Sequence, residues 1–303
     1  REILKPILEE SGLKSGIDIY IAFSPEREDP GNTEFTTKNI PKVVGGDGVV
    51  ARDLTCLLYD KICASTVPVS SLEVAEGVKL TENIFRSVNI AMINELKIIY
   101  SKMGIDVWEV IEAAKSKPFG YMPFYPGPGL GGHCIPIDPF YLSFRAQQFG
   151  QDTKFIKLAG ELNTHMPHYV VNILKKAMNE KLSLVLSSSK VLLVGIAYKK
   201  NIDDTRESPG FVIMDLLESF GAQVDYYDPL IPEIPNTRGH PNLAGRKSIK
   251  WSRKNLSKYD STLICADHDI IDYEKLVNYS KLIVDTRNAT ASFKDSQFKI
   301  VKA

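Results

Sequence analysis

Cys134 has the surroundings that point most clearly to chemistry. It lies in a stretch rich in glycine and proline, residues 117–141 (KPFGYMPFYPGPGLGGHCIPIDPFY), with His133 beside it and Asp138 four residues later. Backbone amides in such a loop stabilise a thiolate or an oxyanion, and a nearby carboxylate can act as a base. We therefore predict a nucleophile at Cys134. The alternative, a small buried side chain, is our interpretation of Cys56, Cys63 and Cys265.

A lysine and an asparagine share one face of a long predicted helix. Lys79 and Asn83 are four residues apart, so they point to the same side, with Glu76 nearby. Together they can donate hydrogen bonds to a developing negative charge. The spacing alone leaves a solvated polar stripe as the alternative.

A third group follows an apolar strand and precedes a helix. The segment KKNIDDTRESP, residues 199–209, stands where α/β folds hold phosphates, and it contains Lys199 and Arg206. Arg287, in the sequence VDTRN, follows another predicted strand and adds a cation at the same edge. An exposed loop of mixed charge is the alternative.

The chain contains a literal GxGxxG pattern, but its position is wrong for a dinucleotide. The pattern at residues 127–132 follows Phe124-Tyr125-Pro126 and leads into the Cys134 loop, whereas the fingerprint follows a strand and begins a helix. The strand at 191–195 leads into the segment VGIAYKKNIDDTR, residues 194–206, which has a single glycine. No segment therefore carries a dinucleotide fingerprint.

Helical and strand patterns place these groups in an α/β chain. We predict a helix at 1–12, strands at 17–23 and 43–44, a Gly45-Gly46 turn, and a helix carrying Cys56 and Cys63. A helix over 71–103 follows, then helices at 106–115, 139–149 and 153–181 around an irregular segment at 116–141.

From residue 189 the pattern is that of a doubly wound α/β domain. Strands are predicted at 190–198, 223–227, 263–266 and 282–284, with a helix from Ser208 to Gly221. We divide the chain into a first α/β part at 1–65, a helical central domain at 66–186 and a C-terminal α/β domain at 187–303.

Composition excludes several classes of protein. The 303 residues carry 37 basic and 37 acidic side chains, which disfavours a nucleic-acid binder with a broad cationic face. No apolar run is long enough to span a membrane, and no signal peptide is recognisable. The four cysteines and five histidines show no metal-binding spacing, so we predict no metal and a reducing, cytoplasmic compartment. Because the first residue is arginine, we expect the chain to begin partway through a longer protein.

Five motifs in order resemble the UDP-glucose/GDP-mannose dehydrogenase family. They are Ser24-Pro25-Glu26, residues 75–83 (AEGVKLTEN), residues 129–139 (GLGGHCIPIDP), Lys199 with residues 203–209 (DDTRESP), and residues 284–288 (VDTRN). The resemblance covers nearly the whole chain. It implies that residues 1–65 are the remnant of an N-terminal Rossmann domain whose NAD-binding fingerprint is absent, and that 187–303 form a Rossmann-like UDP-binding domain.

The resemblance also implies a reaction and a role for each residue. Members oxidise a sugar's primary alcohol to a carboxylate through two hydride transfers to NAD, using a cysteine that forms a thiohemiacetal and then a thioester. Cys134 matches that nucleophile, Lys79 and Asn83 the oxyanion pair, Asp138 the proton-transfer carboxylate and Glu26 the carboxylate that helps hydrolysis. The matching substrate-binding residues are Tyr125, Gly129, Gly131, Gly132, Lys199 and Arg287, and Arg206 matches an arginine at the NAD pyrophosphate.

The loop around Cys134 also bears on the substrate. Glucose-specific members carry GGSC and a lysine before the aspartate, whereas His133 and Ile137 occupy those positions here. The resemblance therefore implies an N-acetylated sugar, and Pro136 with residues 139–141 favours UDP-N-acetylglucosamine over UDP-N-acetylmannosamine. It also implies a homodimer formed through the long central helix.

Two readings from other classes stay open. The chain can be a nucleotide-sugar-binding and dimerisation module without activity of its own, which the absent fingerprint favours. A cysteine hydrolase using Cys134 and His133 is disfavoured, because adjacent residues on an extended loop point apart.

Overall fold

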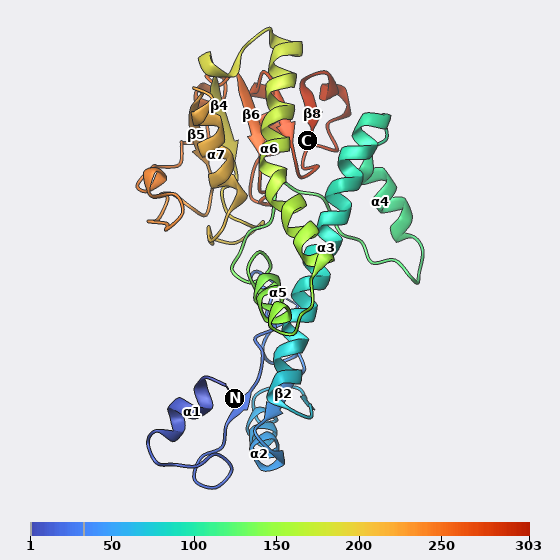
Figure 1. Cartoon of the computed structure of the whole chain (residues 1–303). Coiled ribbons are helices and arrows are strands. Elements are labelled where there is room, and N and C mark those ends of the chain that lie inside the picture. Colours follow the sequence, from blue (N-terminus) through green and yellow to red (C-terminus); the bar gives the residue numbers. More distant parts are fainter. Residues whose placement is uncertain (1, 33) are drawn as a thin grey trace. The chain divides into compact units, whose positions relative to one another are not determined.

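The structure is a computed structural model that describes residues 2–32 and 34–303, and it divides into two compact units (Figure 1). The first unit is Arg1–Phe85 and the second is Arg86–Ala303. The long helix α3, Leu72–Met103, begins in the first unit and ends in the second.

The first unit contains a small three-stranded sheet. Strand β1 (Ala22–Phe23) pairs antiparallel with β2 (Lys42–Gly46), and β2 pairs parallel with β3 (Thr66–Pro68). Helix α1 (Leu4–Glu9) precedes this sheet, and α2 (Val49–Tyr59) connects β2 to β3.

Three predictions for this unit are wrong. Cys63, predicted on the same helix as Cys56, lies beyond the end of α2 at Tyr59. Most of the strand expected at 17–23 is a turn, in which the Lys14 carbonyl accepts hydrogen bonds from the N–H groups of residues 17, 18 and 19. The turn forms because Gly16 adopts a φ of +86° and the Asp18 carboxylate accepts the Lys14 N–H at 2.9 Å. Gly45 and Gly46 are not a turn but the end of β2, where a Cβ at either position would lie 2.2–2.3 Å from the backbone of Ser71 or Arg52.

Helices dominate the first half of the second unit. Helix α4 (Val107–Lys115) begins at Asp106, whose side chain accepts the Trp108 N–H. The segment between α4 and α5 (Asp138–Gln148) has no helix or strand, as the sequence predicted. Helix α6, Lys154–Leu182, leads to the second sheet.

The second sheet has five parallel strands in the order β5-β4-β6-β7-β8 (Figure 1). The structure gives their bounds as β4 Lys190–Val194, β5 Gln223–Tyr227, β6 Ser261–Ile264, β7 Ile283–Asp285 and β8 Ile300–Lys302. The sequence predicted the first four within a few residues and missed β8. A three-residue strand that follows a short 3₁₀ helix, Lys294–Lys299, has too little alternation to be recognised.

Helices cover both faces of this sheet. On one face, Val191 and Leu193 pack against α6 and α7 (Pro209–Ser219) in one buried apolar cluster. On the other face, Leu192 and Val194 belong to a second cluster with residues of α8 (Arg253–Leu256) and α9 (Tyr273–Tyr279). The predicted doubly wound α/β domain is confirmed.

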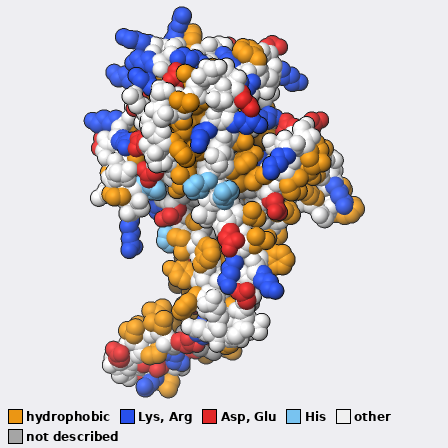
Figure 2. All heavy atoms as spheres, turned by 45° about the horizontal axis from the view of Figure 1, so that its top comes forward, with side chains coloured by type: hydrophobic (Ala, Val, Ile, Leu, Met, Phe, Trp, Pro, Cys, Tyr) orange, Lys and Arg blue, Asp and Glu red, His pale blue; other side chains and the backbone are white. Residues whose placement is uncertain are grey.

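Several apolar side chains nevertheless reach the surface, as the orange spheres in Figure 2 show for the face that it presents. The exposed set includes Ile3, Leu4, Ile7, Leu8, Val50, Leu54, Leu57 and Leu58 on or beside the first two helices, and Phe144 and Phe155 in the second unit. No helix within the described residues combines the length and apolar character needed to span a membrane.

Candidate active site

The carboxyl ends of β4 and β6 mark the place where a ligand is expected to bind. The connections from β4 and β6 run to opposite sides of the sheet, and ligands of such folds bind in the crevice at that switch point. Gly195 follows β4 with a φ of +77°, and a Cβ there would lie 2.2 Å from the Ala266 carbonyl oxygen. The chains leaving the two strands are therefore in direct contact.

Arg287 stands at the same edge, just after β7. Its Nε donates to the Asp267 carboxylate at 3.0 Å, and its backbone N–H donates to Asp285 at 2.9 Å. The two bonds orient the guanidinium toward the glycine- and proline-rich loop, where Nη1 lies 3.5 Å from the Pro126 carbonyl oxygen. A Cβ on Gly127 would lie 2.8 Å from the same nitrogen. The predicted cation is therefore at the predicted edge.

Three glycines bring the Cys134 loop onto the segment between β4 and α7. A Cβ on Gly131 would lie 2.5 Å from the Tyr198 Cβ, and one on Gly129 would lie 3.0 Å from Pro209. Gly132 has a φ of +83°, and its N–H donates to the Arg206 carbonyl at 2.9 Å. Side chains at these positions would push the two segments apart, which explains why the loop needs glycine there.

Cys134 lies two residues beyond this contact and is half-buried. Its carbonyl accepts the N–H of Asp138 at 2.8 Å and that of Ile137 at 3.3 Å, forming a tight turn. Asp138 is thereby fixed as the first residue of α5, one turn away from the cysteine. The structure thus holds the predicted nucleophile and proton-transfer carboxylate in one turn.

Arg206 and Lys199 lie in the segment between β4 and α7. The Arg206 guanidinium is exposed and donates to both oxygens of Asp204, from Nε to Oδ1 at 3.1 Å and from Nη2 to Oδ2 at 2.6 Å. These bonds raise the pKa of Arg206, and the negative charge that Cys134 carries when ionised contributes to the increase. Arg206 is therefore an accessible cation, oriented by Asp204, in the electrostatic field of Cys134, and Lys199 lies half-buried in the same segment.

Tyr125 is held at the other end of the loop. Its hydroxyl donates to Glu112 at 2.7 Å, and its ring stacks on Trp108 with centroids 5.7 Å apart. The hydrogen bond to the carboxylate is the largest cause of the raised pKa of Tyr125. The Tyr125 side chain is therefore held in place and its phenol is neutral.

The remaining predicted residues belong to the first unit. Asn83 is buried and Lys79 half-buried on α3, four residues apart as predicted. Glu26 accepts the backbone N–H groups of Arg27 and Glu28 and pairs with Lys42 at 3.2 Å. Partial burial raises the pKa of Glu26, but these hydrogen bonds and the lysine outweigh it, and the net shift is downward. Glu26 is thus held as a carboxylate.

Sequence reasoning missed a buried polar row on the second half of α3. The Asn94 Oδ1 accepts the Gly127 N–H at 3.0 Å, and its Nδ2 donates to Asn163 at 3.1 Å, so Asn94 anchors the loop from below. Lys97, three residues on, is 4% exposed and its amine has no hydrogen-bond partner among the described residues. The available signal was spacing, because Asn94 follows Asn83 by three helical turns.

Histidines gather on α6, where the rings of His165 and His168 stack with centroids 5.8 Å apart; pale blue in Figure 2 marks histidine side chains. Within residues 2–32 and 34–303, no three His, Cys, Asp or Glu side chains are grouped so as to hold a metal ion.

Two regions of the chain match domain models of one protein family. Residues 73–165 match the central domain of the UDP-glucose/GDP-mannose dehydrogenase family, and residues 192–292 match that family's UDP binding domain. The first match contains the Cys134 loop. The second contains the switch point, Arg206 and Arg287.

Individual relatives carry two substrate names. A UDP-N-acetyl-D-glucosamine 6-dehydrogenase from Pseudomonas aeruginosa is 41% identical over 228 residues, 75% of this chain and 53% of the relative. A UDP-N-acetyl-D-mannosamine dehydrogenase from Pyrococcus horikoshii is 32% identical over 92% of this chain and 63% of its own length. A solved structure of UDP-D-ManNAc dehydrogenase from Pyrococcus horikoshii superimposes with a TM-score of 0.82 at 30% identity, covering 95% of this chain and 66% of that one. The chain thus spans about half to two thirds of the length of these relatives.

Proposed function

Because the chain belongs to the UDP-glucose/GDP-mannose dehydrogenase family, we propose that it forms the nucleophile-bearing and nucleotide-sugar-binding part of an NAD-dependent UDP-N-acetylglucosamine 6-dehydrogenase. The reaction oxidises the C6 alcohol of the sugar to a carboxylate. The observation that carries the proposal is the hydrogen bond from Gly132 to Arg206, because it joins the Cys134 loop to the domain that matches the UDP-binding model.

In this proposal each residue has one chemical task. The Cys134 thiolate adds to the C6 carbonyl carbon of the aldehyde, and the resulting thiohemiacetal becomes a thioester that water hydrolyses, returning the thiolate. Asp138 accepts and returns the proton. Lys79 and Asn83 donate hydrogen bonds to the oxygen that becomes negative, and the Glu26 carboxylate assists the attacking water.

The cofactor NAD, when bound, accepts the two hydrides. Arg206 fits an anionic pyrophosphate, because its guanidinium is exposed and already oriented by Asp204. The sugar nucleotide is assigned to Lys199, Arg287, Tyr125 and the glycines of the loop. Arg287 fits this role because it is fixed at the switch-point edge of the sheet by Asp267.

The identity of the sugar is the finer part of the proposal. The relatives named above include dehydrogenases of both UDP-N-acetylglucosamine and UDP-N-acetylmannosamine. His133 and Ile137 favour an N-acetylated sugar, and Pro136 with residues 139–141 favours N-acetylglucosamine. UDP-N-acetylmannosamine is therefore the second candidate. A nucleotide-sugar-binding module without turnover is the third, favoured by the partial span of the relatives.

Assembly and location follow the same reasoning. We assign a homodimer to the long helix α3, and the division into 1–65, 66–186 and 187–303 to the NAD-binding remnant, the central domain and the UDP-binding domain. All four cysteines are free, which suits a reducing cytoplasm.

Thermal unfolding with added ligands tests the proposal. UDP at 100 times its dissociation constant should stabilise the chain by about 2.7 kcal/mol, whereas NAD alone should change little. UDP-N-acetylglucosamine should bind more tightly than UDP-N-acetylmannosamine in calorimetric titration. Stabilisation by NAD and none by UDP would refute the domain assignment.

Turnover is tested by adding UDP-N-acetylglucosamine and NAD at high protein concentration and following the absorbance of reduced cofactor. Production of reduced cofactor that Cys134→Ala abolishes is the expected result for an active chain. No signal, together with UDP binding, would leave the binding module. Full turnover by Cys134→Ala would exclude the thioester route.

A further inference from the structure

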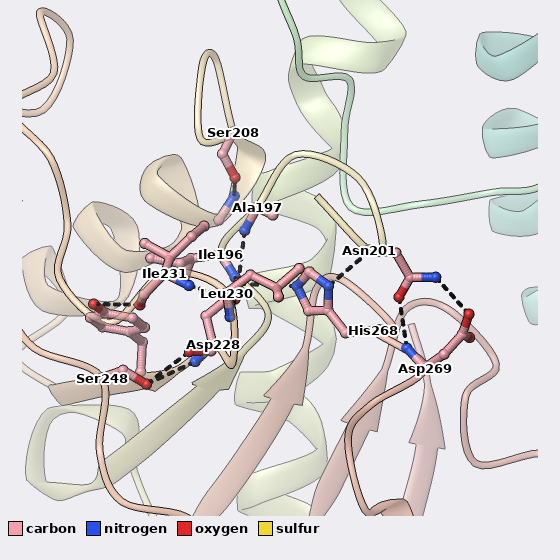
Figure 3. A network of polar contacts seen from close by, with 12 residues as sticks. Ile196, Ala197, Asn201, Ser208, Asp228, Leu230, Ile231, Ser248, His268 and Asp269 are labelled. Carbon is pink, nitrogen blue, oxygen red and sulfur yellow. Dashed lines mark hydrogen bonds and ion pairs between the residues drawn. The ribbon is translucent and has the colours of Figure 1, made fainter. Parts of the chain in front are cut away.

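A fully buried histidine lies beneath the segment that carries Lys199 and Arg206 (Figure 3). His268 follows β6, and neither its side chain nor that of Asp228, which follows β5, is accessible to solvent. The His268 Nε2 lies 3.1 Å from the Asp228 Oδ2, and its Nδ1 lies 2.9 Å from the backbone nitrogen of Asn201. One imidazole therefore joins β5, β6 and the segment after β4.

The two contacts determine the state of the ring. A backbone N–H can only donate, so the His268 Nδ1 must be an unprotonated acceptor. The Nε2 then carries the proton and donates it to Asp228. His268 is therefore a neutral imidazole with its hydrogen on Nε2, and a doubly protonated ring would lose the bond to Asn201.

Both oxygens of the Asp228 carboxylate accept further hydrogen bonds. Its Oδ2 also accepts the N–H groups of Ile196 at 2.7 Å and Ala197 at 3.1 Å, and its Oδ1 accepts those of Leu230 and Ile231. Burial raises the pKa of this carboxyl, but the bonds from His268 and the backbone outweigh it, and the net shift is downward. Asp228 is an ionised acceptor surrounded by donors.

Asn201 is held on its second side by the residue next to His268. The Asn201 side chain donates to the Asp269 carboxylate at 2.6 Å and accepts the Asp269 N–H at 2.9 Å, while Lys200 pairs with that carboxylate at 2.8 Å. Asn201 has a φ of +61°, a conformation that such bonds must stabilise. The turn between Lys199 and Arg206 is therefore fixed at its tip.

That turn is continuous with the Cys134 loop. The Tyr198 N–H donates to the Asp204 carbonyl at 3.0 Å and closes the turn, and the Arg206 carbonyl accepts the Gly132 N–H. A displacement at Asn201 would thus move the cations at its two ends and the seat of the nucleophile loop together.

We propose that His268, as the tautomer protonated on Nε2, is a positioning residue that holds the Lys199–Arg206 segment in the conformation that binds the UDP-sugar. This proposal rests on the proposed function, which names the UDP-sugar as the ligand. Its structural content, the bond from Asn201 to Nδ1, is independent of the ligand.

Three substitutions of His268 separate the two bonds. His268→Phe keeps volume and removes both; His268→Gln keeps a donor at the place of Nε2; His268→Asn keeps an acceptor at the place of Nδ1. We expect hydrogen exchange of the Asn201 amide to be fast in the Phe and Gln variants and still protected in the Asn variant. The UDP dissociation constant should rise about tenfold in the first two and less than about threefold in the third.

The unfolding temperatures of the variants distinguish a positioning role of His268 from a role in stability alone. Each variant loses at least one buried bond, so all three should melt lower, whereas binding should follow only the acceptor. His240→Gln is the matched control, because His240 also bonds an aspartate, Asp215, in the same domain but away from this segment. It should leave the UDP affinity and Asn201 exchange unchanged.

Several outcomes would overturn the proposal. Asn201 protection or UDP affinity that is unchanged in His268→Phe would do so, as would losses that track unfolding temperature across all three variants. If the variants fail to fold, nitrogen NMR of the unaltered protein decides, because a proton on Nδ1 contradicts the assignment and a proton on Nε2 supports it. Absence of UDP binding by the unaltered chain refutes the proposed function, and Asn201 exchange and the tautomer still decide the positioning role.

Discussion

The two α/β regions of this chain differ in how completely their sheets are covered. The sheet of residues 1–85 has three short strands, and the buried apolar side chains described there are Val43, Val44, Ala51, Cys63, Leu72 and Ala75. The second sheet has five parallel strands with an apolar cluster on each face. The second region therefore has the larger buried core, and stability measurements should separate the two.

Hydrogen exchange should reveal the largest difference. Amides of β4 should exchange on the order of 100-fold more slowly than those of β2, because opening the second sheet exposes two apolar clusters and opening the first exposes few buried side chains. Mass spectrometry of exchanged peptides measures both in one sample. Equal protection of β2 and β4 would remove the contrast.

The same leucine substitution in each region should have unequal effects. Leu192→Ala, in the centre of the second sheet, should cost about 3 kcal/mol of unfolding free energy, whereas Leu57→Ala, 63% exposed on α2, should cost less than about 0.5 kcal/mol. Both tryptophans, Trp108 and Trp251, lie in the second unit, so their fluorescence in urea reports on that unit. A large cost from Leu57→Ala would show that the second unit depends on packing of α2.

Within the second region, Lys97 is a buried amine that has no hydrogen-bond partner among the described residues. Burial lowers the pKa of its amine to about 7, an effect that Arg287 adds to and Asp285 opposes. Between pH 7 and 10 the unfolded chain binds a proton that the native chain lacks, so native stability should rise with pH by up to about 1.4 kcal/mol per unit and level off below pH 7. Lys97→Met should remove this slope and stabilise the protein most at pH 6 to 7.

Thermal unfolding from pH 6 to 10 tests this, with the exposed Lys102→Met on the same helix as the control. A slope that survives in Lys97→Met, or that disappears in the control, would contradict the assignment.

The smallest expected effect concerns how helices begin. The Ser208 Oγ accepts the Gly210 N–H at 3.1 Å at the start of α7, whereas α1 and α2 begin at Ile3 and Gly48 without a side-chain hydrogen bond. Ser208→Ala should cost about 1 kcal/mol. Ser219→Ala, at the exposed far end of the same helix, should change little in the same urea titration, and equal costs would deny Ser208 its capping role.

The same contrast explains what could be predicted from sequence. Strands buried on both faces, such as Lys190–Val194, were recognised because burial demands continuous apolar residues, and α3 because its pattern is long. The segment at 17–23 failed because its apolar residues resemble a strand, while Gly16 and Asp18 favour the turn that forms. Sheet pairing, which would decide between them, depends on distant residues.

For the candidate site, the sequence singled out residues by type and motif and missed residues that hold their segments in place. Cys134, Arg206 and Arg287 were recognisable by type and motif. Asn94 and His268 each accept one backbone N–H from the segment that they hold, and which N–H an amide or imidazole meets is determined only by the folded chain.

The hydrogen bond from the Gly132 N–H to the Arg206 carbonyl makes Cys134 a probe of the position of the Lys199–Arg206 segment. The Cys134 loop contacts the Lys199–Arg206 segment closely through its glycines. A shift of that segment would therefore move Gly132, two residues before Cys134. Under the proposed function, the rate at which an alkylating reagent modifies Cys134 should therefore change when UDP is added. The Gly132–Arg206 hydrogen bond would thus couple the position of the Lys199–Arg206 segment to the reactivity of Cys134.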